Sequence, residues 1–326
     1  MKCRVCRCPA VLDVRRHNAN FCEDHFLKLC RDQVAKAICD NEMLSPGDRI
    51  LVAVSGGKDS LALWDILLEL GYDVDGLFVN LGIGDYSSDS GHFAWKFAEA
   101  RGLKLRTIDL RSEFNFDIPA GSRAARRAPC SVCGLSKRHL FDDAALRGNY
   151  NALATGHNLD DEAAVLLGNV LRWEHEYLGR QRPVLQAGGG FPKKVKPLVR
   201  LAERETAAYC VLRGIEYMLE ECPLAEGNRH LAYKEALNGI EDRSPGVKHS
   251  FYFGFQDRSL PLFTNDGGPT TKPISCERCG ASGNGQVCAF CRLLERTGGN
   301  LPSPPASVNI RGTKSVANGH GGNRHG

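Results

Sequence analysis

The chain has 326 residues, of which 42% are hydrophobic and 25% are charged, the balance of a globular protein that can bury a sizeable core. The formal net charge of +4 is too small to indicate a nucleic-acid partner by itself, and no apolar run approaches the length of a membrane span, which excludes a transmembrane protein. The N-terminal residues lack the apolar stretch of a signal peptide, so we expect a cytoplasmic location.

Cysteine is unusually frequent, with 14 residues in the chain. Disulfides are rare in a reducing compartment, where clustered thiols favour metal binding. The first cluster comprises two short pairs separated by a loop: Cys3, Cys6, Cys22 and His25. Because four soft donors in this spacing can converge on a tetrahedral ion, the cluster predicts a structural zinc site.

Helical spacing of apolar residues follows this cluster, from Phe26 to Ile38, with Asp24 as the expected N-cap. A turn at 45–48 then introduces strands that alternate with helices. The expected strands are 50–54, 77–79, 105–110 and 152–155; the expected helices are 61–70, 92–101, 136–147 and 160–171. This order predicts an α/β fold with a parallel, doubly wound sheet and right-handed crossovers.

A glycine-containing loop joins the first of these strands to a helix N-terminus. It reads Ser55-Gly56-Gly57-Lys58-Asp59-Ser60. Backbone N–H groups at such glycines can approach an anion closely, and the helix dipole favours negative charge. The loop therefore predicts a phosphate site, although it lacks the spacing of the P-loop NTPases.

Three cysteines in the middle of the chain form an incomplete set: Cys130 and Cys133 two residues apart, and the distant Cys222. They favour either a zinc site with a non-cysteine fourth ligand or an iron–sulfur cluster with one iron free of protein ligands. The spacing leaves both open. Three other cysteines fall in helical apolar patterns and are expected in the core: Cys30, Cys39 and Cys210.

The remainder of the chain reads as mainly helical from about Glu203, followed by a second metal module. This four-thiolate ribbon comprises Cys276, Cys279, Cys288 and Cys291 and also predicts structural zinc. The expected organisation is a zinc-binding module and helix over 1–45, a nucleotide-binding core over 46–202, a helical part over 203–270, the ribbon over 271–297 and a disordered tail over 298–326.

The loop Ser55–Ser60 resembles the PP-loop of the N-type ATP pyrophosphatases. Combined with the middle cysteines, the segment Gly156–Glu162 and both terminal zinc patterns, residues 1 to about 297 resemble the TtuA-type tRNA 2-thiouridine synthetases, relatives of the cytosolic wobble-uridine thiolases. The resemblance implies an ATP-dependent tRNA sulfurtransferase. Such an enzyme adenylates the C2 oxygen of a tRNA uridine and replaces that oxygen with sulfur.

The resemblance also implies the cofactors and their sites. ATP with Mg²⁺ would bind at Ser55, Gly56, Gly57, Lys58, Asp59 and Ser60, with Val79 and Gly156 beside the nucleotide. Cys130, Cys133 and Cys222 would hold a [4Fe-4S] cluster, and the two terminal sets would hold two Zn²⁺ ions. Lys137 and Asp161 match catalytic positions of this family. Without the resemblance, Lys137 could be a solvated lysine and Asp161 a helix-capping acid.

The implied partners are tRNA, a ubiquitin-like sulfur-carrier protein and a second copy of the chain in a homodimer. Two basic groups are candidates for contact with tRNA phosphates. They are Arg123, Arg126 and Arg127, and Lys193, Lys194 and Lys196. The sequence leaves open whether uridine 54 or uridine 34 is modified.

Two alternative functions compete with this interpretation. A related PP-loop enzyme could thiolate tRNA cytidine or use nitrogen in place of sulfur, although the cytidine thiolases lack the two terminal zinc modules. A non-catalytic zinc-ribbon module that binds RNA would carry a vestigial loop. The intact Ser55–Ser60 loop and Asp161 argue against the module.

Overall fold

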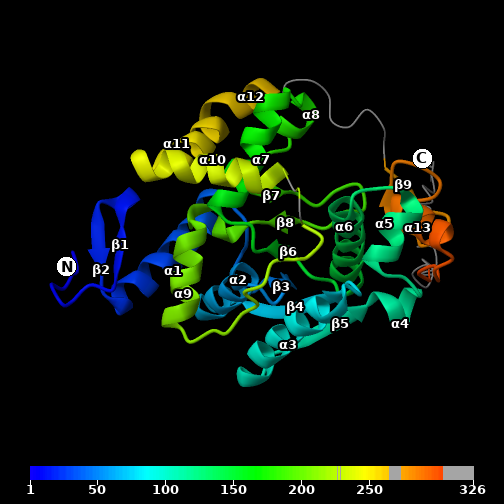
Figure 1. Cartoon of the computed structure of the whole chain (residues 1–326), viewed down its shortest axis with the longest axis horizontal. Helices are drawn as coiled ribbons and strands as arrows, with labels where there is room; N and C mark the ends of the chain where they lie inside the picture. Colours follow the sequence, from blue (N-terminus) through cyan, green and yellow to red (C-terminus); the bar gives the residue numbers. More distant parts are fainter. Residues whose placement is uncertain (226, 228, 264–272, 304–326) are drawn as a thin grey trace, which may run out of the picture.

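The computed structural model describes residues 1–225, 227, 229–263 and 273–303, so that most of the tail expected to be disordered lies outside the described residues. Its centre is a six-stranded sheet in the order β5-β4-β3-β6-β8-β7 (Figure 1). The neighbours from β5 to β8 pair in parallel, and β7 pairs antiparallel at the edge. This arrangement confirms the predicted α/β fold with a mainly parallel sheet.

The strands and helices of this core alternate along the chain. They are β3 (Arg49–Val54), α2 (Lys58–Glu69), β4 (Asp73–Asn80), α3 (Gly84–Ala100), β5 (Leu105–Asp109), α4 (Leu110–Phe114), α5 (Ile118–Ala125), α6 (Pro129–Arg147), β6 (Ala152–Thr155), α7 (Leu159–Arg172), α8 (His175–Leu178), β7 (Val184–Leu185) and β8 (Lys194–Val195).

Both faces of the sheet are buried, because side chains of a strand point alternately to opposite sides. Ile50, Val52 and Val54 of β3 belong to one apolar cluster, which also contains residues of α2 and of two helices outside this core, α1 (Glu23–Asp40) and α9 (Glu203–Leu212). Leu51 belongs to a second cluster, with residues of α6 and the C-terminal ribbon. The continuous apolar run of β3 therefore supplies two cores at once.

Several boundaries differ from the expected ones. The helix α6 begins at Pro129, well before the expected start at Ser136, so Cys130 lies in its first turn and Cys133 at the start of its second. The helix α3 begins at Gly84, where no apolar periodicity indicates a start. The strands β7 and β8 span two residues each and were not predicted, because two residues show no periodicity.

The N-terminal module is a hairpin of β1 (Leu12–Val14) and β2 (Ala19–Phe21), with η1 (Arg15–His17) between them, followed by α1 (Glu23–Asp40). Arg16 joins it to the core through two 2.7 Å hydrogen bonds to the Glu205 carboxylate, and both side chains are buried. Two expectations were wrong here. The N-cap of α1 is Cys22, not Asp24, and Cys39 is exposed.

The C-terminal part is mainly helical before the ribbon, as predicted. It contains η2 (Pro197–Arg200), α9 (Glu203–Leu212), α10 (Arg229–Arg243), α11 (Val247–Gly254), η3 (Phe255–Ser259) and α12 (Leu260–Phe263), then β9 (Ile274–Ser275), β10 (Ser282–Gly283) and α13 (Ala289–Thr297). Figure 1 shows the N-terminal hairpin and the ribbon at opposite ends of the molecule. No helix in the described part of the chain is long and apolar enough to cross a membrane.

Candidate functional site

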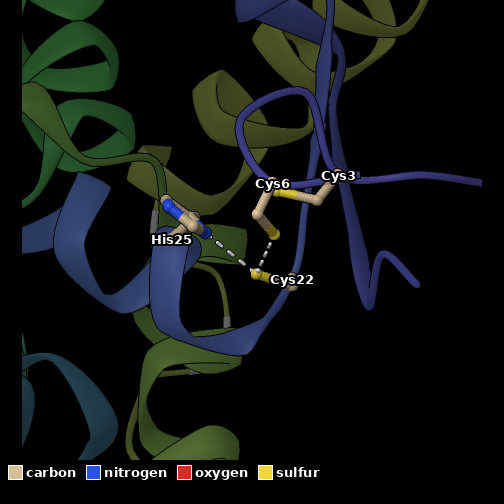
Figure 2. Close-up of side chains that lie close together, drawn as sticks. All are labelled: Cys3, Cys6, Cys22 and His25. Atoms are coloured by element: carbon tan, nitrogen blue, oxygen red, sulfur yellow. Dashed lines mark hydrogen bonds between the residues drawn. The ribbon is translucent and has the colours of Figure 1, made fainter. Parts of the chain in front are cut away.

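The four predicted ligands of the N-terminal module converge (Figure 2). The Sγ atoms of Cys6 and Cys22 lie 3.6 Å apart, and Cys22 Sγ lies 3.1 Å from Nδ1 of His25. Metal–sulfur bonds of about 2.3 Å in a tetrahedron place two sulfur ligands roughly 3.8 Å apart. Burial opposes ionisation of Cys3, but backbone amides of neighbouring residues outweigh it and lower the thiol pKa to about 6. The donor set therefore fits a tetrahedral zinc ion.

The ribbon at the other end brings its four cysteines together in the same way, with all four buried. Cys279 and Cys288 are 3.8 Å apart between Sγ atoms, again a tetrahedral edge. A hydrogen bond with Cys279 and the neighbouring His139 together outweigh burial and lower the pKa of Cys288 to about 3. Four buried thiols that converge at tetrahedral distances fit a structural zinc site.

Packing of the ribbon against the core involves aromatic rings. Phe290 of α13 stacks on His139 of α6 at 4.5 Å between ring centroids. It also makes edge contacts with Phe114 and Phe116. The C-terminal cysteine set is thus packed directly against the helix that carries Cys130 and Cys133.

The predicted phosphate loop joins β3 to α2 and is fixed by its two serines. Ser60 Oγ accepts from the Ser55 amide at 3.1 Å and donates to the Gly57 carbonyl at 2.9 Å. Gly57 is the N-cap of α2, and no side chain caps this helix. Unsatisfied N–H groups of the first turn therefore remain available to an anion.

Gly56 is required by the loop conformation. Its φ of +76° is in the left-handed region, and a Cβ atom there would lie 2.0 Å from the Ser90 carbonyl oxygen of α3. Gly57 differs, because a Cβ on it would meet only Ser55 Oγ at 3.5 Å.

Substituting Gly56→Ala is therefore expected to destabilise the fold by about 2 kcal/mol, the usual cost of strain in this region combined with a backbone collision. Thermal unfolding of the two variants measures the effect, with Gly57→Ala as the matched control. We expect a clear fall in Tm for Gly56→Ala and little change for the control. Equal melting temperatures would contradict this account.

A cavity of about 490 Å³ opens beside the loop. Six of the predicted site residues line it: Ser55, Asp59, Ser60, Val79, Lys137 and Gly156. Asp161 and Lys58 do not line it, but they belong to an adjoining network of charges. Three residues of the loop thus share one cavity with Lys137, which is far away in the sequence, whereas Gly56, Gly57 and Lys58 do not line it.

The adjoining network alternates lysines and carboxylates. Lys58 Nζ lies 2.6 Å from Glu203 and 3.2 Å from Asp59, and Lys234 Nζ lies 2.6 Å from Asp161 and 3.1 Å from Glu203. Burial opposes the charge on Lys234, but Asp161 and Glu203 outweigh it and raise its pKa. Sequence reasoning missed Lys234 and Glu203, since no local motif marks either residue.

Asn158 connects two acids of this network. Its Nδ2 donates to Asp59 at 3.0 Å, and its Oδ1 accepts from the Asp161 amide at 3.1 Å in a capping box. Burial raises the pKa of Asp59, although Lys58 and hydrogen bonds from Thr206 and Asn158 oppose this. Asp161 is therefore both a helix-capping acid and the partner of Lys234, a half-buried cation.

The three middle cysteines come together from two elements. Cys130 and Cys133 lie in the first two turns of α6, and Cys222 lies in the segment after α9. Cys130 Sγ is 3.8 Å from the Leu224 carbonyl oxygen. Burial raises the pKa of Cys133, Lys137 lowers it, and the thiols of Cys222 and Cys130 raise it further.

These thiols lie beside the cavity that Ser55, Asp59 and Ser60 of the loop line. Tyr86 lines that cavity, and after burial the thiols of Cys222 and Cys133 are the next causes of its raised pKa. The Sγ atoms of these three cysteines do not all lie within 4.8 Å of one another, unlike the ligand atoms of each terminal set. Ligands of a cluster bind different iron atoms, so their sulfurs need not approach as closely as ligands of one ion. Three neighbouring thiols, with Cys130 exposed, fit a cluster that keeps one iron free of protein ligands.

The parallel sheet, the loop, the cavity and the thiols beside it agree with the PP-loop fold that the sequence predicts. Comparisons with known proteins show which family the chain resembles. The family model of the N-terminal LIM domain of the 2-thiouridine synthetase TtuA matches residues 2–27. A tRNA-5-methyluridine(54) 2-sulfurtransferase of Thermus thermophilus is 47% identical over 295 residues, covering 90% of this chain and 91% of that protein.

Two further similarities agree. The protein of the same name from Pyrococcus horikoshii is 40% identical, covering 90% of this chain and 93% of its own length. The U34-tRNA thiolase NcsA from Methanococcus maripaludis, solved with its [4Fe-4S] cluster, superposes with a TM-score of 0.75 at 26% identity, covering 90% of this chain and 96% of that one. The chain therefore belongs to the TtuA family of tRNA 2-sulfurtransferases, enzymes of tRNA thiolation.

Proposed function

We propose that the protein replaces the C2 oxygen of uridine 54 in tRNA with sulfur, using ATP to activate that oxygen, in the cytoplasm. The observation that carries the proposal is the single cavity lined by the phosphate loop and Lys137, with Cys130, Cys133 and Cys222 beside it. Position 54 is favoured over position 34 because the relatives at 47%, 40% and 37% identity bear that name.

The proposed reaction has two steps. The C2 oxygen of uracil attacks the α-phosphorus of ATP, the bond to the β-phosphate breaks, and pyrophosphate leaves. A sulfide then attacks C2, the C2–oxygen bond breaks, and AMP leaves with that oxygen. Adenylation is needed because an unactivated carbonyl oxygen is a poor leaving group.

The residues of the chain are assigned roles from their positions. Backbone N–H groups of 55–60 would bind the phosphates with Mg²⁺, and Val79 and Gly156 would contact the nucleoside. Lys137 has no carboxylate within ion-pair distance among the described residues, so its ammonium can neutralise charge on the reacting phosphate. Asp161, fixed by Asn158 and Lys234, would orient Mg²⁺ or accept a proton.

An iron–sulfur cluster and two zinc ions complete the proposed cofactors. Cys130, Cys133 and Cys222 would hold a [4Fe-4S] cluster, whose open iron supplies a Lewis-acid position for sulfide. The terminal sets would hold two structural zinc ions. A ubiquitin-like sulfur carrier and a homodimer remain proposals that rest on the family alone.

Nucleoside analysis tests the proposed function. The protein is reconstituted anaerobically with iron and sulfide, incubated with ATP, sulfide and unmodified tRNA, and the digested tRNA is examined by mass spectrometry. We expect 2-thiouridine in wild-type tRNA and none in a transcript carrying cytidine at position 54. Thiolation that persists in this transcript but requires uridine 34, or formation of 2-thiocytidine, would overturn the assignment.

Lys234 gives a second test of the proposed site. We expect Lys234→Met to lower kcat for pyrophosphate release by up to about 100-fold, because a displacement of Asp161 by about 1 Å costs that much. The KM for ATP should change little, since Lys234 does not line the cavity. Lys234→Arg keeps the charge and should recover part of the rate. An effect on KM alone would contradict a positioning role for Lys234.

A further inference from the structure

A small hollow lies where the ribbon packs against the core, between α5 and α13. Its volume is about 260 Å³, and three arginines line it: Arg127, Arg292 and Arg296. The other lining residues are Ala125, Ala289 and Leu293, so none of the described residues that line it is acidic. Positive charge is therefore concentrated in a concave surface formed by two segments distant in sequence.

The positive charge of this hollow is not neutralised by the protein. Arg127, Arg292 and Arg296 are exposed, and none has a carboxylate within ion-pair distance in the described part of the chain. Arg292 donates to the Val287 carbonyl at 2.8 Å, a contact that leaves its charge uncompensated. Glu295 of the same helix pairs with Arg278 at 3.0 Å. Exposed arginines without an acidic partner are suited to bind an external anion.

The second basic group of the sequence is different. Lys194 Nζ lies 2.7 Å from Asp142, and Lys196 Nζ lies 2.7 Å from Glu162. Lys193 donates to the Glu42 carbonyl at 3.0 Å. Two of its three charges are thus cancelled within the protein. The structure distinguishes two groups that look equivalent in the sequence.

The hollow is close to the middle cysteines. Arg127 ends the turn after α5, two residues before α6 begins at Pro129, and Cys130 follows in the first turn. Arg123 and Arg126 of the same segment are also exposed. A polyanion bound along these arginines would pass beside the exposed Cys130.

We propose that Arg127, Arg292 and Arg296 bind the phosphate backbone of the tRNA substrate, so that the C-terminal ribbon contributes directly to the tRNA interface. The proposal rests on the proposed function only in taking tRNA as the substrate. Guanidinium groups match phosphate geometry and are favoured in such contacts. These contacts position the RNA without reading its sequence.

Binding of unmodified tRNA to the full-length protein, without ATP and over a series of NaCl concentrations, tests the proposal. We expect the triple variant Arg127→Gln, Arg292→Gln, Arg296→Gln to bind at least about tenfold more weakly, with a salt slope shallower by about three, or one for each lost phosphate contact. The triple replacement by lysine should retain most of the slope. Arg296→Gln alone, a milder change, should reduce the slope by about one.

The matched control is Arg278→Gln, which removes one positive charge from the same ribbon at a guanidinium already paired with Glu295. It should leave tRNA affinity unchanged. Zinc content and MgATP binding of all variants should equal those of the wild type. Unchanged tRNA affinity in the triple variant would overturn the proposal. The proposal would also be overturned if the triple variant lost carrier-dependent thiolation but kept its tRNA affinity. The hollow would then bind an acidic surface of the sulfur-carrier protein. Failure of the proposed function is distinguishable, since the wild type would then bind tRNA without thiolating it.

Discussion

Replacing Cys130, Cys133 or Cys222 by alanine is expected to lower tRNA thiolation by at least about 100-fold, because loss of outer-shell partners alone costs 10–100-fold in metal sites. The fold should persist, since Cys130 is exposed and the other two are only partly buried. Anaerobic reconstitution followed by iron analysis and thiolated-nucleoside analysis measures both consequences. Each variant should retain less iron and form almost no 2-thiouridine.

The control for this prediction is Cys39→Ala, which removes an exposed cysteine of α1 that belongs to neither terminal set. It should keep full iron content and activity. MgATP binding should be unchanged in every variant, because none of the three cysteines lines the nucleotide cavity. Normal thiolation by the triple alanine variant would refute a role for the cysteines in sulfur delivery.

The variant Lys137→Met is expected to slow tRNA-dependent pyrophosphate release by about 100- to 1,000-fold, the usual effect of removing one preorganised electrostatic group. Lys137 lines the nucleotide cavity and has no carboxylate partner among the described residues, so its charge is available to the reacting phosphate. Rapid-quench measurement of pyrophosphate from bound ATP isolates this step from sulfur transfer.

Arg147→Met provides the comparison for Lys137→Met, because it removes one cation from the other end of α6, where Arg147 pairs with Asp143 at 2.7 Å. Its rate should stay close to that of the wild type. Iron content should be normal in both variants. If Lys137→Met released pyrophosphate at the wild-type rate but failed to transfer sulfur, its role would belong to the second step.

Sequence patterns were sufficient for the four strands β3 to β6 and for the convergence of the two terminal cysteine sets. A continuous apolar run such as Ile50–Val54 predicts a strand that is buried on both faces. The structure places this strand at the centre of the sheet. The ligand pairs were predictable because a short spacing is itself a geometric constraint. The start of α6 was harder to predict from the sequence, because a proline followed by two cysteines is as typical of a loop as of a first helical turn.

The missed residues share a different cause. Lys234 contacts Asp161 across 73 positions of the sequence, and such a contact depends on the packing of α10 against α7. The paired state of Lys194 and Lys196 depends likewise on carboxylates from other helices. Local spacing reports which residues can act together only when they lie on the same element. Charge compensation between elements has to be seen in three dimensions.

The stacking of Phe290 on His139 joins the C-terminal ribbon to α6, the helix that carries Cys130 and Cys133. A structural zinc ion contributes roughly 10–16 kcal/mol to the folding of a small module. If the ribbon binds zinc as proposed, a cell starved of this ion would lose the ordered ribbon, and with it the support for the helix that carries Cys130 and Cys133. Nutrient zinc would then limit this modification of tRNA even where iron and ATP are plentiful.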